Sequence, residues 1–182
     1  MEKLKVRDLM TPVGEFPQLP ASATFYEALQ ALEEAQGKYL AGESKQRILL
    51  VADAAGRIIG KISPIDLLRG LETNYQRVDA EKSLRRFGLN YVWEAMQKEY
   101  QLWENPFKDL CRKAVGVHIG DFIKPSAEQS VGIDDNLMKC FNLFVMNRHD
   151  ALFVLEGTEI VGLLRFSDVF KRVSQTMKAC AL

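Results

Sequence analysis

Short apolar runs separated by polar breaks set the pattern of this chain. In one stretch, Ile48 to Val51 is continuously apolar, a polar break closes on Gly56, and a second largely apolar run extends to Ile62. Two short apolar runs joined by a glycine-closed break are typical of a β-hairpin. We therefore expect two antiparallel strands in this stretch.

The hairpin leads directly into a predicted helix. Ser63 stands at the N-cap, Pro64 at the first helical position and Asp66 in the first turn, and an apolar face follows up to Leu71. Serine is favoured at the N-cap and proline at the first helical position. A strand is therefore expected to deliver the chain into the N-terminus of a helix.

The same pattern returns in the second half of the chain. Ala151 to Val173 aligns with the first stretch without a gap, so that Gly60 falls on Gly162 and Asp66 falls on Asp168. A duplicated pattern of this kind indicates two equivalent structural units.

A short segment and a helix precede each hairpin. Val6 to Met10 is strand-like and is echoed by a segment ending at Pro125, and a capping box at Thr24 predicts a helix ending near Gly37. The expected helical stripes are Phe25, Ala28, Leu29 and Leu32 in the first copy and Leu137, Phe141, Phe144 and Val145 in the second. The first copy is the longer one, with its excess expected between Lys38 and Arg47.

The middle segment, Glu72 to His118, belongs to neither copy. It is rich in aromatic and charged residues and poor in glycine, which predicts one or two helices. Trp93, Met96, Tyr100 and Trp103 fall on one helical face. That face either packs on the protein's own core or forms a surface for a partner.

Composition narrows the class of protein. The chain has 182 residues, 47% of them hydrophobic, and 24 acidic residues balance 24 basic ones, so there is no overall positive charge for nucleic acid. The first residues lack the apolar core of a signal peptide, and no run is long enough for a membrane helix, which predicts a cytoplasmic protein. The three cysteines are far apart, so we expect neither a disulfide framework nor a metal site.

The two glycine-to-aspartate segments, Gly60 to Asp66 and Gly162 to Asp168, resemble the signature of cystathionine-β-synthase (CBS) domains. The segments that end at Pro12 and Pro125 are similar to the opening strand of that family. The resemblance implies an α+β fold with two CBS-type repeats, residues 1–72 and 118–182, related by pseudo-twofold symmetry and joined by a helical insertion over residues 73–117.

The resemblance also implies a function. Tandem CBS pairs, often called Bateman modules, bind adenosine-containing ligands in clefts between their repeats and commonly dimerise. In that family the hydroxyl residue contacts phosphate and the aspartate holds the ribose hydroxyls, which assigns Ser63 and Asp66 to one site and Asp168 to the other. The expected ligands are AMP, ADP or ATP, ahead of NAD or S-adenosylmethionine, with no cofactor required.

The residues support two interpretations of the first site. A helix N-terminus offers unpaired N–H groups to a phosphate, Ser63 can add a hydroxyl, and Asp66 can accept hydrogen bonds from a ribose diol. The same residues, with Pro64, also form an ordinary helix cap that needs no ligand. The sequence leaves both open.

Arg165 departs from the family pattern, because it replaces the hydroxyl residue. It can donate two hydrogen bonds to a phosphate, or it can fill the cleft and pair with a nearby carboxylate. The remaining candidates for ligand contacts are Arg148, His149, Lys124, Thr11 and Val13.

Catalysis is not expected. The chain has two histidines and lacks a nucleophile elbow or a glycine-rich phosphate loop, so no catalytic residue is assigned. The favoured function is a regulatory module that senses an adenine nucleotide and signals through a homodimer to an unidentified partner protein. The alternative is a ligand-free module that recruits a partner through the aromatic insertion. The helical residues expected to form the dimer surface are Leu67, Leu68, Leu71, Val169, Phe170 and Val173.

Overall fold

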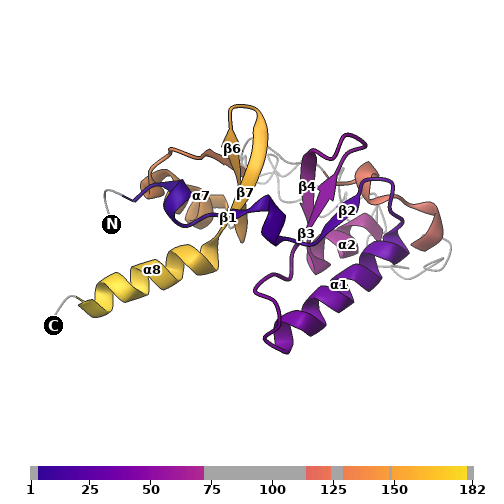
Figure 1. Ribbon diagram of the computed structural model, residues 1–182, viewed down its shortest axis with the longest axis horizontal. Helices are drawn as coiled ribbons and strands as arrows, with labels where there is room; N and C mark the ends of the chain where they lie inside the picture. The colour runs from indigo at the N-terminus through magenta and orange to yellow at the C-terminus, as the bar shows by residue number, and fades with distance from the viewer. Residues whose placement is uncertain (1–3, 72–113, 124–128, 148, 180–182) are drawn as a thin grey trace, which may run out of the picture. The chain divides into compact units, whose positions relative to one another are not determined.

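The computed structural model describes residues 4–71, 114–123, 129–147 and 149–179, and it contains two small sheets accompanied by helices (Figure 1). The predicted α+β class is therefore confirmed. The chain forms two compact units, one from Met1–Pro20, Ile48–Lys61 and Ile123–Leu182 and the other from Ala21–Arg47 and Ile62–Phe122. The aromatic face expected at Trp93 to Trp103 lies outside the described residues.

The four-stranded sheet has the order β1-β7-β6-β5. Its strands are β1 (Thr11–Pro12), β5 (Ser130–Gly132), β6 (Ala151–Glu156) and β7 (Glu159–Arg165). β6 and β7 form the hairpin that the second apolar pattern predicts, and Gly157 provides its turn with φ 61°. β5 lies parallel to the other side of β6, so β6 is a central strand, which explains its continuous run of apolar residues.

The three-stranded sheet has the order β2-β3-β4. Its strands are β2 (Gln18–Pro20), β3 (Leu49–Ala52) and β4 (Ile58–Ile62). The turn between β3 and β4 closes through a bond of 2.9 Å from the Asp53 N–H to the Arg57 carbonyl, and Gly56 adopts φ 77°. A positive φ of this size favours glycine, so the first predicted hairpin is also confirmed.

The described helices follow the predicted order within each copy. They are α1 (Phe25–Leu40) and α2 (Pro64–Leu71) in the first copy, and α7 (Leu137–Asn147) and α8 (Phe166–Ala179) in the second. The capping box before α1 is present, since the Thr24 N–H donates to Glu27 Oε2 at 2.7 Å and the Glu27 N–H donates to Thr24 Oγ1 at 3.2 Å.

The end of α1 corrects the prediction. The helix continues past Gly37, and its C-terminal turn is made by Gly42 with φ 76°. The Glu43 N–H donates to the Lys38 carbonyl at 2.9 Å and the Gly42 N–H donates to the Tyr39 carbonyl at 3.1 Å, which is a Schellman arrangement. Gly37 can remain helical because glycine weakens a helix without ending it.

The strand expected at Val6 to Met10 is also wrong. Val6–Asp8 is a short 3-10 helix, η1, and the corresponding segment of the second copy, Ile119–Asp121, is the similar helix η3. The Lys5 N–H donates to Asp8 Oδ2 at 2.9 Å and the Asp8 N–H donates to the Lys5 carbonyl at 3.1 Å, so these local bonds close a turn in place of a strand.

These two leading segments, Lys5–Asp8 and His118–Asp121, each bond to the chain that precedes the first helix of the other copy. The Val6 N–H donates to the Asp135 carbonyl at 3.0 Å, just before α7. The Ile119 N–H donates to the Ala23 carbonyl at 2.9 Å, just before α1. Each copy therefore holds the leading segment of the other.

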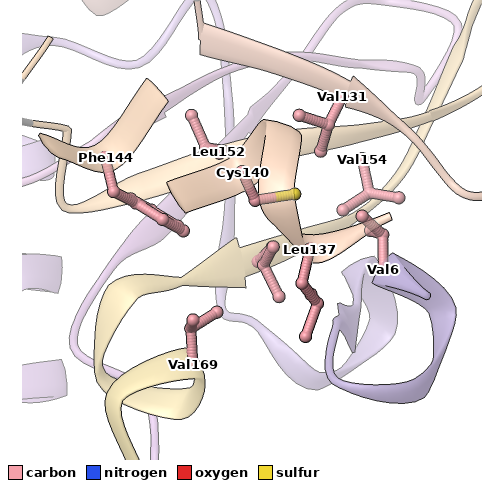
Figure 2. Packing of buried hydrophobic residues seen from close by; sticks show 9 residues of the cluster. Val6, Val131, Leu137, Cys140, Phe144, Leu152, Val154 and Val169 are labelled. Atoms are coloured by element: carbon pink, nitrogen blue, oxygen red, sulfur yellow. The ribbon is translucent and has the colours of Figure 1, made fainter. Parts of the chain in front are cut away.

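A cluster of buried side chains joins α7 and α8 to the four-stranded sheet (Figure 2). It consists of Val6, Val131, Leu137, Cys140, Phe144, Leu152, Val154, Leu164 and Val169. Figure 2 shows the sulfur of Cys140 among these apolar groups, and burial raises the pKa of this thiol to about 11. The thiol is therefore protonated at neutral pH and serves as an apolar side chain.

A second cluster, Phe16, Leu50, Phe153 and Leu163, takes members from β3 of one sheet and from β6 and β7 of the other. Two predicted core positions are wrong, because Leu29 and Val145 are exposed on their helices. Two residues predicted to lie at a dimer surface, Leu67 and Val169, are buried within the chain, so that part of the prediction is wrong.

Candidate functional site

The first candidate site is the start of α2. Ser63 is 6% exposed. Its N–H donates to Asp66 Oδ2 at 2.9 Å, and its hydroxyl donates to the same oxygen at 2.6 Å. Pro64 occupies the first helical position, as the sequence predicts. Ser63 and Asp66 therefore form a cap, and their role in binding a ligand stays a prediction.

The equivalent point of the second copy is the start of α8. Arg165 ends β7, and Asp168 lies in the first turn of the helix that follows immediately. Arg165 Nε donates to Asp168 Oδ2 at 2.6 Å and Arg165 Nη2 donates to Asp168 Oδ1 at 2.9 Å. The pair with a carboxylate is one of the two arrangements that the sequence leaves open for this arginine.

Further polar residues gather where β6 begins. Phe166, the first residue of α8, donates its N–H to the Asp150 carbonyl at 2.9 Å, so this point adjoins the start of α8. The Asp150 carboxylate accepts a bond of 3.1 Å from Lys61 Nζ, and the Lys61 side chain is only 11% exposed. His149 Nε2 is buried and has no hydrogen-bond partner among the described residues.

Lys61 is a polar residue of this region that was not predicted from the sequence, although a comparison of the two copies points to it. In the gapless alignment Lys61 falls on Leu163, a fully buried member of the cluster between the sheets. A lysine in place of a core leucine requires a partner for its charge, and Asp150 supplies one.

Thr11 and Val13 follow the first leading segment in the chain. Thr11 is buried in β1 and pairs with Leu163 of β7, while Val13 begins the short helix η2 (Val13–Glu15) and packs against the cluster between the sheets. The carbonyl of Thr11 approaches Gly162 so closely that a Cβ there would lie 2.7 Å from it. The glycine of the repeated signature is therefore needed for β1 to lie against β7.

The candidate residues divide between the two compact units. Thr11, Val13, His149, Arg165 and Asp168 belong to the unit that contains β6 and β7, and Ser63, Pro64 and Asp66 belong to the other. Lys124 and Arg148 lie outside the described residues. Within the described ranges, no three histidine, cysteine or acidic side chains gather as a metal site would need.

Two acidic residues just before α7 form charged hydrogen bonds, and the first of them, Asp134, binds the leading segment Lys5–Asp8. Hydrogen bonding from Lys5, together with the charge of Arg7, lowers the pKa of Asp134. A hydrogen bond from Lys139 lowers the pKa of Asp135, whose carboxylate also accepts from the Gly132 N–H at 2.8 Å. Both groups therefore favour the folded state while they are ionised.

Among the helices that the structure describes, none is both long and apolar enough to cross a membrane. The family model for the CBS domain matches the sequence twice, over residues 6–73 and 119–175. A comparison with curated protein sequences finds no match.

Several solved structures share the fold. The CBS-pair protein CBSX2 of Arabidopsis thaliana, in a complex with AMP, is 21% identical over 95% of this chain and 98% of its own, with a TM-score of 0.59. The AcuB protein of Vibrio cholerae is 16% identical over 96% of this chain and 93% of its own, with a TM-score of 0.56. The cytosolic domain of the Mg²⁺ channel MgtE, in a complex with ATP, is 17% identical over 90% of this chain and 46% of its own, with a TM-score of 0.51. At these identities the likeness shows the fold alone.

Proposed function

Because this chain belongs to the CBS domain family and carries two copies of the domain, we propose that it is a regulatory module that binds an adenine nucleotide. CBSX2 with AMP and the MgtE domain with ATP are structures of the same fold with such ligands. The observation that carries the proposal is the pairing of Ser63 with Asp66 at the start of α2, which places a hydroxyl and a carboxylate beside a helix N-terminus.

Each part of this site has a role in the proposal. The N-terminus of α2 offers backbone N–H groups and positive potential to a phosphate, and the Ser63 hydroxyl can rotate toward it. When the hydroxyl turns to a phosphate, Asp66 keeps the bond from the Ser63 N–H and accepts from a ribose hydroxyl in place of the serine hydroxyl. Charge-assisted bonds of this kind are about twice as strong as neutral ones, which makes Asp66 the main determinant of ribose binding.

Signalling in this proposal runs through a homodimer to a separate protein. Leu68 and Phe170 are 56% and 60% exposed, and both belong to the apolar helical positions expected at a dimer surface. On α8, Phe166, Phe170, Val173 and Met177 recur at helical spacing, and three of them are exposed. Association of two copies would cover this surface, and a ligand that favours one dimer arrangement would shift its population.

Calorimetric titration of the protein with AMP, ADP, ATP, NAD and S-adenosylmethionine tests the proposal. We expect saturable binding of at least one of the first three nucleotides, with weaker binding of the last two ligands. The absence of a binding isotherm with all five ligands would refute the nucleotide-binding function.

The second candidate is an interaction module that binds no nucleotide. The specific observation in its favour is that apolar side chains on α2 and α8 are exposed, with Leu68 at 56% and Phe170 at 60%. In this case the exposed apolar positions of α2 and α8 would contact a partner protein directly. A folded protein that binds none of the five ligands is the result that this candidate predicts.

A further inference from the structure

The starts of α2 and α8 are equivalent in sequence but differ in one side chain. Ser63 and Arg165 each stand three residues before the aspartate of the repeated signature. In the first copy a small hydroxyl contacts a single carboxylate oxygen, Asp66 Oδ2. In the second copy a guanidinium group contacts both oxygens of Asp168. The duplicated site is therefore chemically unequal.

The Arg165–Asp168 contact uses both oxygens of the aspartate and is partly shielded from solvent. It is bidentate, with bonds of 2.6 and 2.9 Å, and the two side chains are only 18% and 26% exposed. Two parallel charge-assisted bonds fix the planar guanidinium in one orientation. Limited exposure reduces the screening that weakens ion pairs on open surfaces.

We infer that Arg165 closes the second nucleotide site, so that each chain binds one nucleotide rather than two. This inference rests on the proposed function, because it assumes that the first site binds through Ser63 and Asp66. The arginine side chain occupies space that a serine would leave to the ligand. Its guanidinium also engages both oxygens of the carboxylate to which the ribose would bind.

A phosphate would have to separate this pair before it could use Arg165. The aspartate would then remain, partly covered, beside an incoming anion, and like charges at that distance repel. The pair also compensates the position of Arg165 at a helix N-terminus, where a lone positive charge is unfavourable. Arg165 is therefore better placed to hold Asp168 than to receive a phosphate.

The test compares binding stoichiometry in the parent protein and in Arg165→Ser, which restores the hydroxyl found in the first copy. Titration with AMP is expected to give one equivalent per chain for the parent protein and two for Arg165→Ser. Arg165→Thr provides a second version of the same change, and thermal melting identifies any variant that does not fold. Adding Asp66→Ala to Arg165→Ser should leave only the newly opened site.

Arg57→Ser is the matched control. Arg57 also contacts an aspartate, Asp53, with its Nε at 2.8 Å and its Nη2 at 2.7 Å, but it lies in the hairpin turn of the first copy. Removing this arginine is expected to leave the stoichiometry at one. A gain of binding in both Arg57→Ser and Arg165→Ser would overturn the inference, because loss of positive charge in general would then explain it.

The outcomes separate this inference from the proposed function. Two equivalents in the parent protein, or one in Arg165→Ser and Arg165→Thr, would overturn the closure of the second site and leave the nucleotide-binding function intact. A second equivalent that weakens in Arg165→Ser would also overturn it, since Arg165 would then hold phosphate. If the parent protein binds no AMP, the proposed function fails, and so does the inference that each chain binds one nucleotide. One equivalent in Arg165→Ser would then support only the closure of the second site by Arg165, whereas no binding in Arg165→Ser would overturn that closure as well.

Discussion

Replacing Asp66 with alanine separates the two roles that this residue can have. The change removes the acceptor for both bonds from Ser63, at 2.9 and 2.6 Å, while Ser63 itself remains buried. Loss of a helix cap costs about 1 kcal/mol, and leaving a buried donor without a partner costs roughly 1–3 kcal/mol. The lost cap and the unpaired donors are the same groups of Ser63, so the two costs are counted once and we expect a loss of stability of about 1–2 kcal/mol.

The effect on nucleotide binding is expected to be separate from this loss. A charge-assisted hydrogen bond contributes about 1.5–3 kcal/mol, so Asp66→Ala should weaken AMP binding by roughly 10- to 150-fold. It should also remove the preference for AMP over its 2′-deoxy analogue. Denaturant unfolding measures the first quantity, and calorimetric titration at a temperature where the variant is folded measures the second.

Asp66→Asn is the control for the cap. Asparagine keeps an oxygen that can accept from Ser63 but has no charge, so it should retain most of the stability and lose much of the ribose binding. The reasoning is refuted if Asp66→Ala loses stability and still binds AMP like the parent protein. In that case Asp66 would be a helix cap and nothing more.

Three further predictions follow from other parts of the fold. Gly162→Ala should destabilise the protein by roughly 1–3 kcal/mol in denaturant unfolding, because the new Cβ would lie 2.7 Å from the β1 backbone. Gly14→Ala is the control and should have a much smaller effect, because a Cβ at Gly14 would have nothing within 4 Å. Lys5 holds the pKa of Asp134 below the ordinary aspartate value of 3.8, so the stability that this group contributes is present above that value and is lost as the pH falls through the lowered pKa. Asp134→Asn should therefore make the melting temperature less dependent on pH in the acid range. Phe170→Glu should convert a dimer to a monomer in sedimentation at roughly tens of micromolar, and a parent protein that is monomeric at that concentration would contradict the dimer proposal.

Local patterns were sufficient for the hairpins and the helix starts. A glycine-closed break between two apolar runs gives strands β3 and β4, and the spacing from Thr24 to Glu27 gives the start of α1. These features depend on contacts between residues close in sequence, which is why they can be predicted without a structure. The Ser63–Asp66 cap belongs to the same class.

Features that depend on distant partners were not predictable in this way. Val6–Asp8 reads as a strand, but the Val6 and Arg7 N–H groups donate to the chain before α7 and the Asp8 N–H donates to the Lys5 carbonyl, so the segment forms a 3-10 turn. Leu67 and Leu68 are both leucines on one short helix, and only the packing of the fold makes one buried and the other exposed. The contact of Arg165 with Asp168 depends on the rotamer of a long side chain, which spacing alone does not determine.

Comparing the two copies position by position separates what maintains this fold from what can differ between its sites. Gly60 and Gly162 are alike because each lies where another segment approaches its backbone closely, with the Ile123 side chain against one and the Thr11 carbonyl against the other. The position three residues before the shared aspartate has diverged instead, to Ser63 in one copy and Arg165 in the other. A substitution of the first kind would disturb the packing of the repeats, whereas one of the second kind can alter a single site and leave the fold intact. A duplicated fold can therefore acquire unequal sites through single substitutions at the starts of its helices.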